Sequence, residues 1–261
     1  MICNYHTHTY RCKHAHGTID EYIEAAIERD VVALGISDHT PLPDNRWLAV
    51  RMHIDELQAY SDEIDAAKLT YQHQIHIMKG MECDWAPQYL EFYQQVLLDK
   101  YKFDYLIGAS HWFPCNGNWE VAFAITEPKQ VIAYAEFYAQ AIACGLFSFM
   151  AHPDVFCANY DWDEVAIKGS QIILQAAQDY DVPLEINGYG FRKKKSKLPS
   201  GERVGYPYHK FWELACNYDI KVFCNSDAHL PEDVIAGIDD AQALAEKLNL
   251  QKITFNSVVI E

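Results

Sequence analysis

The chain has 261 residues, of which 50% are hydrophobic, and its formal net charge is −16 at pH 7. This length suits one barrel-sized domain with a large core. Such an acidic balance argues against a nucleic-acid-binding surface or a face for anionic membranes, because both require positive charge. A small anionic substrate would therefore need local cations that overrule the negative field of the whole molecule.

Short apolar runs alternate with amphipathic segments along the whole sequence. The runs predict strands near residues 2–6, 31–36, 75–81, 103–109, 147–151, 182–187, 221–225 and 252–255. The segments between them predict helices near residues 19–30, 54–70, 87–99, 127–144, 163–180, 207–218 and 232–248. This alternation predicts an α/β protein with a parallel sheet, closed into a barrel of about seven or eight units, with a doubly wound open sheet as the alternative.

No repeat, low-complexity segment or linker divides the sequence, so we expect one domain over residues 1–261. The basic loop 192–203 is the only marked change in composition. The eight cysteines form no CxxC pair, and the N-terminus has no apolar core of signal-peptide length. The apolar stretch 131–151 is interrupted by polar residues and predicts a buried helix followed by a strand. We therefore expect a cytoplasmic protein with reduced thiols and no membrane partner.

Histidines recur where predicted strands give way to loops. Six histidines follow a predicted strand in this way: His6, His8, His39, His111, His152 and His229. His14 lies in the first loop. Residues two apart in a strand point the same way, so His6 and His8, like Asp227 and His229, can present two ligands to one point. Imidazoles with a few carboxylates suit zinc, iron or manganese better than magnesium or calcium. Glu82, in KGMECDW, adds a carboxylate able to bridge two ions.

The motifs HTHT, SDHT, GMECDW, SHW, HPD and SDAH together resemble the polymerase and histidinol phosphatase (PHP) domain family, in the same order from residue 6 to residue 229. Within that family, the stretches RMHIDELQAYSDEIDAAKLTY, IHIMKGMECDW and PLEINGYGFRKK are most similar to the monofunctional histidinol-phosphate phosphatases. The resemblance implies a distorted (β/α)7–8 barrel of PHP type, with a metal cluster at the C-terminal face of the strands.

The same resemblance implies two or three divalent ions of zinc, manganese or iron. The implied metal ligands are His6, His8, His14, His39, Glu82, His111, His152, Asp227 and His229. His14 has the family's spacing from His8, and His16 is the alternative ligand in this loop. Asp38 and Asp154 are expected to orient neighbouring ligands rather than to bind metal, because ligating imidazoles usually donate their other N–H to such a group.

The activity implied is that of a metal-dependent phosphomonoesterase. The expected reaction is hydrolysis of L-histidinol phosphate to L-histidinol and phosphate by a metal-bound hydroxide, as a step of histidine biosynthesis. The expected catalytic residues are Glu82, Asp227, His229 and Arg192. Two alternatives remain: hydrolysis of another small phosphate ester or phosphodiester, and a non-catalytic metal-binding or regulatory domain.

Contacts to the substrate are expected from loops near the ligands. Arg192 follows the run PLEIN and the flexible GYG, and its guanidinium can match two phosphate oxygens, a role that Arg203 could share. Acidic or aromatic side chains would suit a cationic leaving group. The candidates are Trp112, Phe113, Trp119, Glu120 and Asp84. Histidinol-phosphate phosphatases commonly carry a basic residue shortly after the HPD motif, whereas this chain reads HPDVFCANYDW.

Overall fold

The computed structural model describes residues 1–255, and the contacts within the chain divide it into two compact units. The first unit comprises Met1–Ile107, Asn225–Ala236 and the described residues from Thr254. The second comprises Gly108–Cys224 and Gly237–Ile253. Both units combine parallel strands with helices, which confirms the predicted α/β class. The expectation of a single domain stays a prediction.

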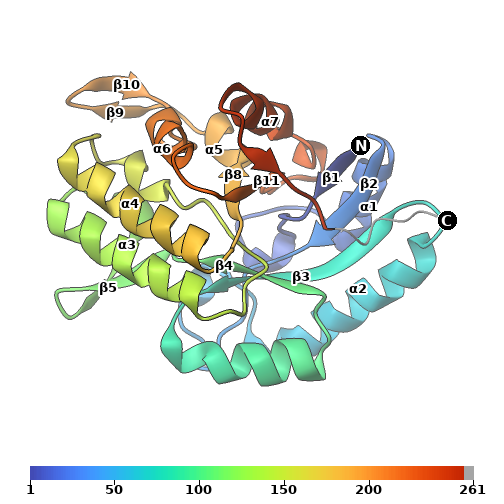
Figure 1. Cartoon of the computed structure of the whole chain (residues 1–261). Helices are drawn as coiled ribbons and strands as arrows, with labels where there is room; N and C mark the ends of the chain where they lie inside the picture. Colours follow the sequence, from blue (N-terminus) through green and yellow to red (C-terminus); the bar gives the residue numbers. More distant parts are fainter. Residues whose placement is uncertain (256–261) are drawn as a thin grey trace. The chain divides into compact units, whose positions relative to one another are not determined.

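Three parallel strands, side by side in Figure 1, form the centre of the first unit. They are β1 (Ile2–Asn4), β2 (Val31–Ile36) and β3 (His76–Asp84), and β4 (Tyr105–Ala109) begins in this unit. The helices are α1 (Ile19–Ile27) and α2 (Leu57–Tyr71), and the shorter turns are η1 (Tyr10–Cys12), η2 (Leu48–Val50), η3 (Ile54–Glu56), η4 (Pro87–Tyr89) and η8 (Pro231–Asp233). The helix expected near 87–99 is η4 followed by the π-helix η5 (Phe92–Lys100).

The Tyr105 side chain crosses two neighbouring strands because glycines leave room for its ring. A Cβ atom on Gly35 would lie 1.9 Å from the Tyr105 hydroxyl oxygen, and one on Gly80 would lie 2.2 Å from Cζ of the same ring. The hydroxyl donates a hydrogen bond of 2.6 Å to the carbonyl of Tyr5, the residue before His6. The end of β1 is thereby held in place just before the first histidines.

The second unit contains its own parallel strands, in the order β7 (Phe149–Met150), β8 (Leu184–Asn187), β11 (Lys221–Asn225) and β12 (Gln251–Lys252). Its helices are α3 (Pro128–Ala143), α4 (Glu164–Asp179), α5 (Gly188–Arg192), α6 (His209–Ala215) and α7 (Ile238–Lys247), with the turns η6 (Ala122–Ala124) and η7 (Val155–Ala158). Helices α3 and α4 lie side by side (Figure 1), and Gly169 permits their close approach, since a Cβ there would lie 2.8 Å from Cγ1 of Val131.

Two antiparallel hairpins of the second unit were not expected from the sequence. One consists of β5 (Trp112–Cys115) and β6 (Asn118–Val121), and the other of β9 (Ser196–Leu198) and β10 (Gly201–Arg203). The second hairpin occupies most of the stretch expected to be a basic loop. No helix in the described part of the chain is long and apolar enough to cross a membrane.

Candidate metal centre

In the first unit, the HTHT segment pairs with the segment that carries Asp227 and His229. Thr7 and Ala228 form a parallel bridge, in which the His8 N–H donates to the Ala228 carbonyl at 2.9 Å and the Ala228 N–H donates to the His6 carbonyl at 3.3 Å. The Asn4 side chain donates to the Ser226 hydroxyl at 2.7 Å. These contacts hold ligand candidates together although more than 200 residues separate them in sequence.

A second bridge brings His39 to Glu82. The two residues pair in parallel just beyond β2 and near the end of β3, and the Thr40 N–H donates to the Glu82 carbonyl at 2.8 Å. Nδ1 of His39 lies 2.7 Å from Oε2 of Glu82. The end of a buried parallel strand therefore supplies a carboxylate beside imidazoles, as the sequence pattern predicted.

The two carboxylates lie at distances from the imidazoles that suit a shared ion. Oε1 of Glu82 lies 3.4 Å from Nε2 of His6, and its Oε2 lies 3.5 Å from Nε2 of His8. Oδ1 of Asp227 lies 3.0 Å from Nε2 of His8 and 3.6 Å from Nε2 of His6. Ligands that each bind a transition metal at about 2.1 Å lie roughly 3 to 3.5 Å apart around it. The donors present therefore fit divalent transition ions.

Three groups of side chains in the first unit have ligand atoms within 4.8 Å of one another and match the predicted ligand set. They are His6, His8 and Asp227; His8, His39 and Glu82; and His14, His39 and His229. His14 belongs to one of these groups, whereas His16 belongs to none of those found among the described residues. Of the two histidines considered for this loop, the geometry favours His14.

Burial of these residues sets their charge states. Desolvation lowers the pKa of His8, and it lowers that of His229 to about 4, so both imidazoles are neutral near pH 7 and able to bind a cation. Burial alone would raise the pKa of Asp227, but the charge of His6 and a hydrogen bond from His8 outweigh it and hold that pKa well below its usual range. The neutral rings of His8 and His229 and the ionised carboxylate of Asp227 have the protonation states that metal binding requires.

Two of the predicted ligands have a backbone conformation that non-glycine residues rarely adopt. The φ angle is +49° at Asp227 and +34° at His152. Such a conformation costs of order 1–3 kcal/mol and persists where surrounding contacts demand it, most often at functional sites. The strain agrees with a role for both residues in a site rather than in packing alone.

Asp38 and Asp154 are buried carboxylates that accept hydrogen bonds from backbone and side-chain donors. The Asp38 carboxylate accepts hydrogen bonds from the N–H and the hydroxyl of Thr9, at 2.9 and 2.7 Å, and burial raises its pKa to about 7. Asp154 accepts from the Tyr208 N–H at 2.5 Å and from Nε1 of Trp212 at 3.2 Å. The expectation that both carboxylates orient neighbouring ligands stays a prediction. Asp38 holds Thr9, the last residue of HTHT and the neighbour of His8.

The second unit brings His111 and His152 together. Their ring centroids lie 4.9 Å apart, and the His152 N–H donates to Oε2 of Glu185 at 3.2 Å. Glu185 is fully buried in β8, where the Asn187 side chain also donates to it at 2.9 Å. The sequence interpretation missed Glu185, although a charged residue inside the apolar run VPLEIN was a signal for it.

The basic candidates of the second unit differ in their surroundings. Arg192 ends the short helix α5, with its guanidinium 5.0 Å from the centre of the Tyr189 ring. Arg203 stacks on Tyr208 at 3.8 Å and donates to the carbonyls of Cys157 and Tyr160 at 2.9 and 2.8 Å. The Arg203 guanidinium thus lies beside the loop after HPD, which has no basic residue of its own. Its hydrogen bonds there are to backbone carbonyls, so they stabilise the loop.

Aromatic and acidic candidates for the substrate also separate by burial. Trp112 is half-buried beside His111, with ring centroids 5.8 Å apart. Phe113 is fully buried and packs edge-on against Tyr134, and Asp84 is buried in an ion pair of 2.6 Å with Arg51. The expectation that Phe113 and Asp84 face a substrate is therefore wrong, because packing and charge pairing occupy them.

Comparison with known proteins agrees with this fold and donor set. The PHP domain family model matches residues 4–188. A protein named "Probable histidinol-phosphatase" from Deinococcus radiodurans is 29% identical, over 97% of this chain and 96% of that protein. A protein of the same name from Schizosaccharomyces pombe is 25% identical, over 97% of this chain and 89% of that protein.

Among solved structures, histidinol phosphate phosphatase from Lactococcus lactis, complexed with zinc, L-histidinol and phosphate, has the same fold. Its TM-score is 0.76 at 16% sequence identity, and the match covers 100% of this chain and 98% of that chain. The fold and the His/Asp/Glu donors define an α/β protein with a site for divalent metal ions. The chain belongs to the PHP domain family, and the comparisons place it among the phosphatases of that family.

Proposed function

We propose that the protein is a metal-dependent phosphomonoesterase that hydrolyses L-histidinol phosphate to L-histidinol and phosphate. The observation that carries the proposal is the buried group of Glu82, Asp227 and imidazoles in the first unit, with ligand atoms 2.7 to 3.6 Å apart. The zinc, L-histidinol and phosphate bound to the Lactococcus lactis enzyme of the same fold support the choice of substrate.

The proposed metal ligands are the nine residues predicted from the sequence. In the first unit they are His6, His8, His14, His39, Glu82, Asp227 and His229, and in the second unit they are His111 and His152. Zinc, manganese or iron, two or three ions in all, would lower the pKa of water and neutralise charge on the phosphoryl group.

The side chains of the chain itself hold and orient this chemistry. Glu82 directs Oε1 toward His6 and Oε2 toward His8 and His39, so one carboxylate can serve two ions. Asp227 stays ionised and adds a second negative charge beside His6 and His8. The two carboxylates would neutralise part of the charge of the bound ions. The positive charge that remains would attract a phosphate ester to an otherwise acidic protein.

The proposed substrate contacts come from the second unit. Arg192 would bind phosphate oxygens through its planar guanidinium, on a helix whose start is fixed by the Asn187 side chain, which accepts from the Gly190 N–H at 3.1 Å. Trp112 would contact the imidazole or amine of histidinol. We assign Arg203 the supporting role of holding the loop after HPD rather than a direct contact with phosphate.

The test is phosphate release from L-histidinol phosphate, beside other monoesters and one phosphodiester, with protein of measured metal content. Glu82→Gln should lower kcat/KM by more than about a hundredfold, since even residues that only support metal ligands are worth 10–100-fold. Glu136→Gln, an exposed carboxylate on α3, is the matched control and should behave as the parent protein.

Hydrolysis of other esters but not of L-histidinol phosphate would overturn the substrate and leave the metal chemistry. A protein with full metal content that releases phosphate from no ester would overturn the enzymatic proposal.

A further inference from the structure

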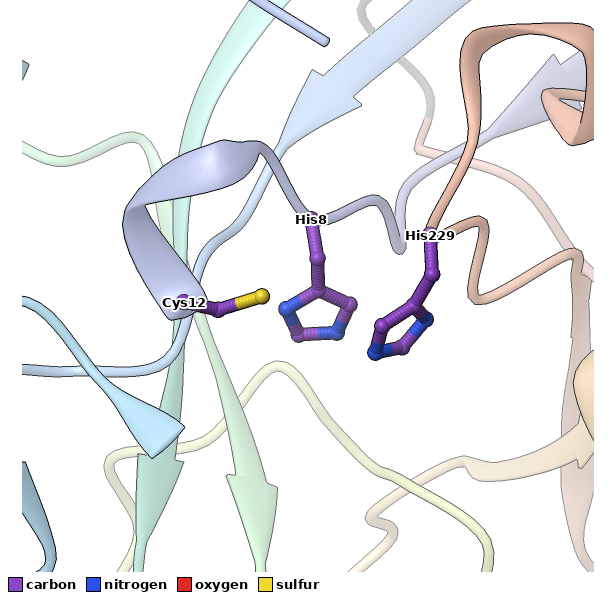
Figure 2. Close-up of side chains that lie close together, drawn as sticks. All are labelled: His8, Cys12 and His229. Atoms are coloured by element: carbon purple, nitrogen blue, oxygen red, sulfur yellow. The ribbon is translucent and has the colours of Figure 1, made fainter. Parts of the chain in front are cut away.

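A cysteine thiol lies against two of the proposed metal ligands and is not one of the nine. Cys12 is 0% exposed. Its Sγ atom, one ring nitrogen of His8 and one ring nitrogen of His229 all lie within 4.8 Å of one another. Figure 2 shows the sulfur next to the His8 ring, with the His229 ring on the other side of His8.

The position of the sulfur is set by the turn that carries it. Cys12 ends η1, which begins after Thr9, and the Cys12 N–H donates to the Thr9 carbonyl at 3.1 Å. Thr9 is itself held by the Asp38 carboxylate, and the Cys12 carbonyl lies 2.7 Å from Nδ1 of His14. These contacts fix the backbone that carries the thiol, beside His8.

The His8 ring supplies an independent sign that a ligand belongs here. His8 is fully buried, and its Nδ1 atom has no hydrogen-bond partner among the described residues. A buried polar atom without a hydrogen bond costs roughly 1–3 kcal/mol. The His8 and His229 ring centroids lie 4.5 Å apart, so a cation bound by the sulfur and by both rings could satisfy such an atom.

We propose that His8, Cys12 and His229 form a site for a soft, thiol-binding metal cation, with Cd(II) as its probe. Sulfur and imidazole donors select soft and borderline ions over manganese or magnesium. Around zinc, bonds of about 2.3 Å to sulfur and 2.0 Å to nitrogen place ligand atoms roughly 3.5 Å apart, so three atoms that lie within 4.8 Å of one another would need to approach by at most about an ångström. On binding, the S–H bond breaks, an S–metal bond forms, and the proton leaves to solvent without any redox step.

The consequence is a competition for shared ligands. His8 and His229 belong both to this group and to the groups assigned to hydrolysis. A soft ion held by Cys12 would withdraw these two imidazoles from the hydrolytic ions and inhibit the enzyme. This consequence, unlike the binding itself, rests on the proposed function.

Binding is tested without substrate, by titrating the full-length protein with Cd(II) and recording the ultraviolet charge-transfer band of a sulfur–cadmium bond. The parent protein should develop the band and saturate near one equivalent, whereas Cys12→Ser should lose it. Cys216→Ser, which removes an exposed thiol, is the matched control and should keep the band. A band that persists in Cys12→Ser, or that is lost only in Cys216→Ser, contradicts the site.

A second measurement uses the parent protein alone and so does not depend on the folding of a variant. X-ray absorption at the cadmium edge, with one equivalent bound, should show one sulfur neighbour besides nitrogen or oxygen neighbours. A shell without sulfur overturns the proposal.

Inhibition is then measured as the Cd(II) concentration that halves phosphate release, relative to each variant's own uninhibited rate. Cys12→Ser should need at least a tenfold higher concentration than the parent protein. Equal concentrations, with the sulfur–cadmium band present in the parent, would overturn the inhibitory role while the binding site stands. Absence of phosphate release from any ester would instead count against the proposed function.

Discussion

Glu82 and Asp84 are two buried carboxylates on the same strand with opposite surroundings. The Glu82 oxygens face imidazoles, including Nδ1 of His39 at 2.7 Å. A cation could replace these contacts and bind the carboxylate and the rings together. Asp84 is neutralised by the Arg51 guanidinium at 2.6 Å, with both side chains at most 1% exposed. Only Glu82 is therefore available to a metal ion, although both residues stand in the motif GMECDW.

Replacing Arg51 by Met should destabilise the protein by about 3–5 kcal/mol, because it leaves the Asp84 charge buried without its partner. Denaturant unfolding, followed by circular dichroism, measures this change in the free energy of unfolding. The control is Arg46→Met, which removes a more exposed pair with Asp44 and should cost less than about 1 kcal/mol. Equal losses in the two variants would refute the buried-pair argument.

At the scale of secondary structure, helices were easier to predict than short strands. The α1 helix begins after Thr18, whose side chain forms a capping box with Glu21, and it buries Ile19, Tyr22, Ile23 and Ala26 on one face. Such a start and such spacing can be read from neighbouring residues. Strand β7 has only two residues and β12 only two, so their ends depend on pairing with strands that are distant in sequence.

Replacing Gly237 by Ala should destabilise the protein more than the same change at Gly117. Both glycines have positive φ angles, +77° and +79°, a conformation that costs another residue about 1–2 kcal/mol. A Cβ on Gly237 would also lie 2.3 Å from the carbonyl oxygen of Gly188, whereas one on Gly117 would meet nothing within 4 Å. Denaturant unfolding of both variants measures the difference, and equal losses would show that the close approach is unimportant.

Because Gly188 begins α5, the Gly237→Ala variant should also raise KM for L-histidinol phosphate through displacement of Arg192. Gly117→Ala should leave KM unchanged. A Gly237→Ala protein with reduced stability and an unchanged KM would argue against Arg192 as the phosphate-binding residue.

For the whole molecule, metal binding and folding are coupled. The carboxylates and imidazoles of the proposed centre come from distant parts of the sequence and meet only in the folded chain. An ion that binds only the folded state stabilises it by roughly 2.7 kcal/mol at a concentration 100 times its Kd. The ion also offsets repulsion within a chain of net charge −16.

Addition of Mn(II) or Zn(II) to chelator-treated protein should therefore raise Tm, and a chelator should reverse the change. Mg(II) has the same charge but prefers oxygen ligands, so it should raise Tm much less and serves as the control for screening. Differential scanning calorimetry of the parent and of Glu82→Gln measures the effect, which the variant should largely lose. An equal rise with Mg(II) would mean that charge screening, rather than a metal centre, stabilises the fold.

The sequence by itself determined the α/β class, the positions of most helices and the residue types of the metal centre. These features are local, since periodicity, capping residues and the strand-end places of His6, His39 and Glu82 are each encoded by near neighbours. The tertiary structure decided that Asp84 is paired with Arg51, and that Cys12 lies beside His8. It also brings His14, which the sequence interpretation already preferred to His16, to His39 and His229. These outcomes depend on how distant segments pair, as Thr7 does with Ala228, and no local pattern specifies that pairing.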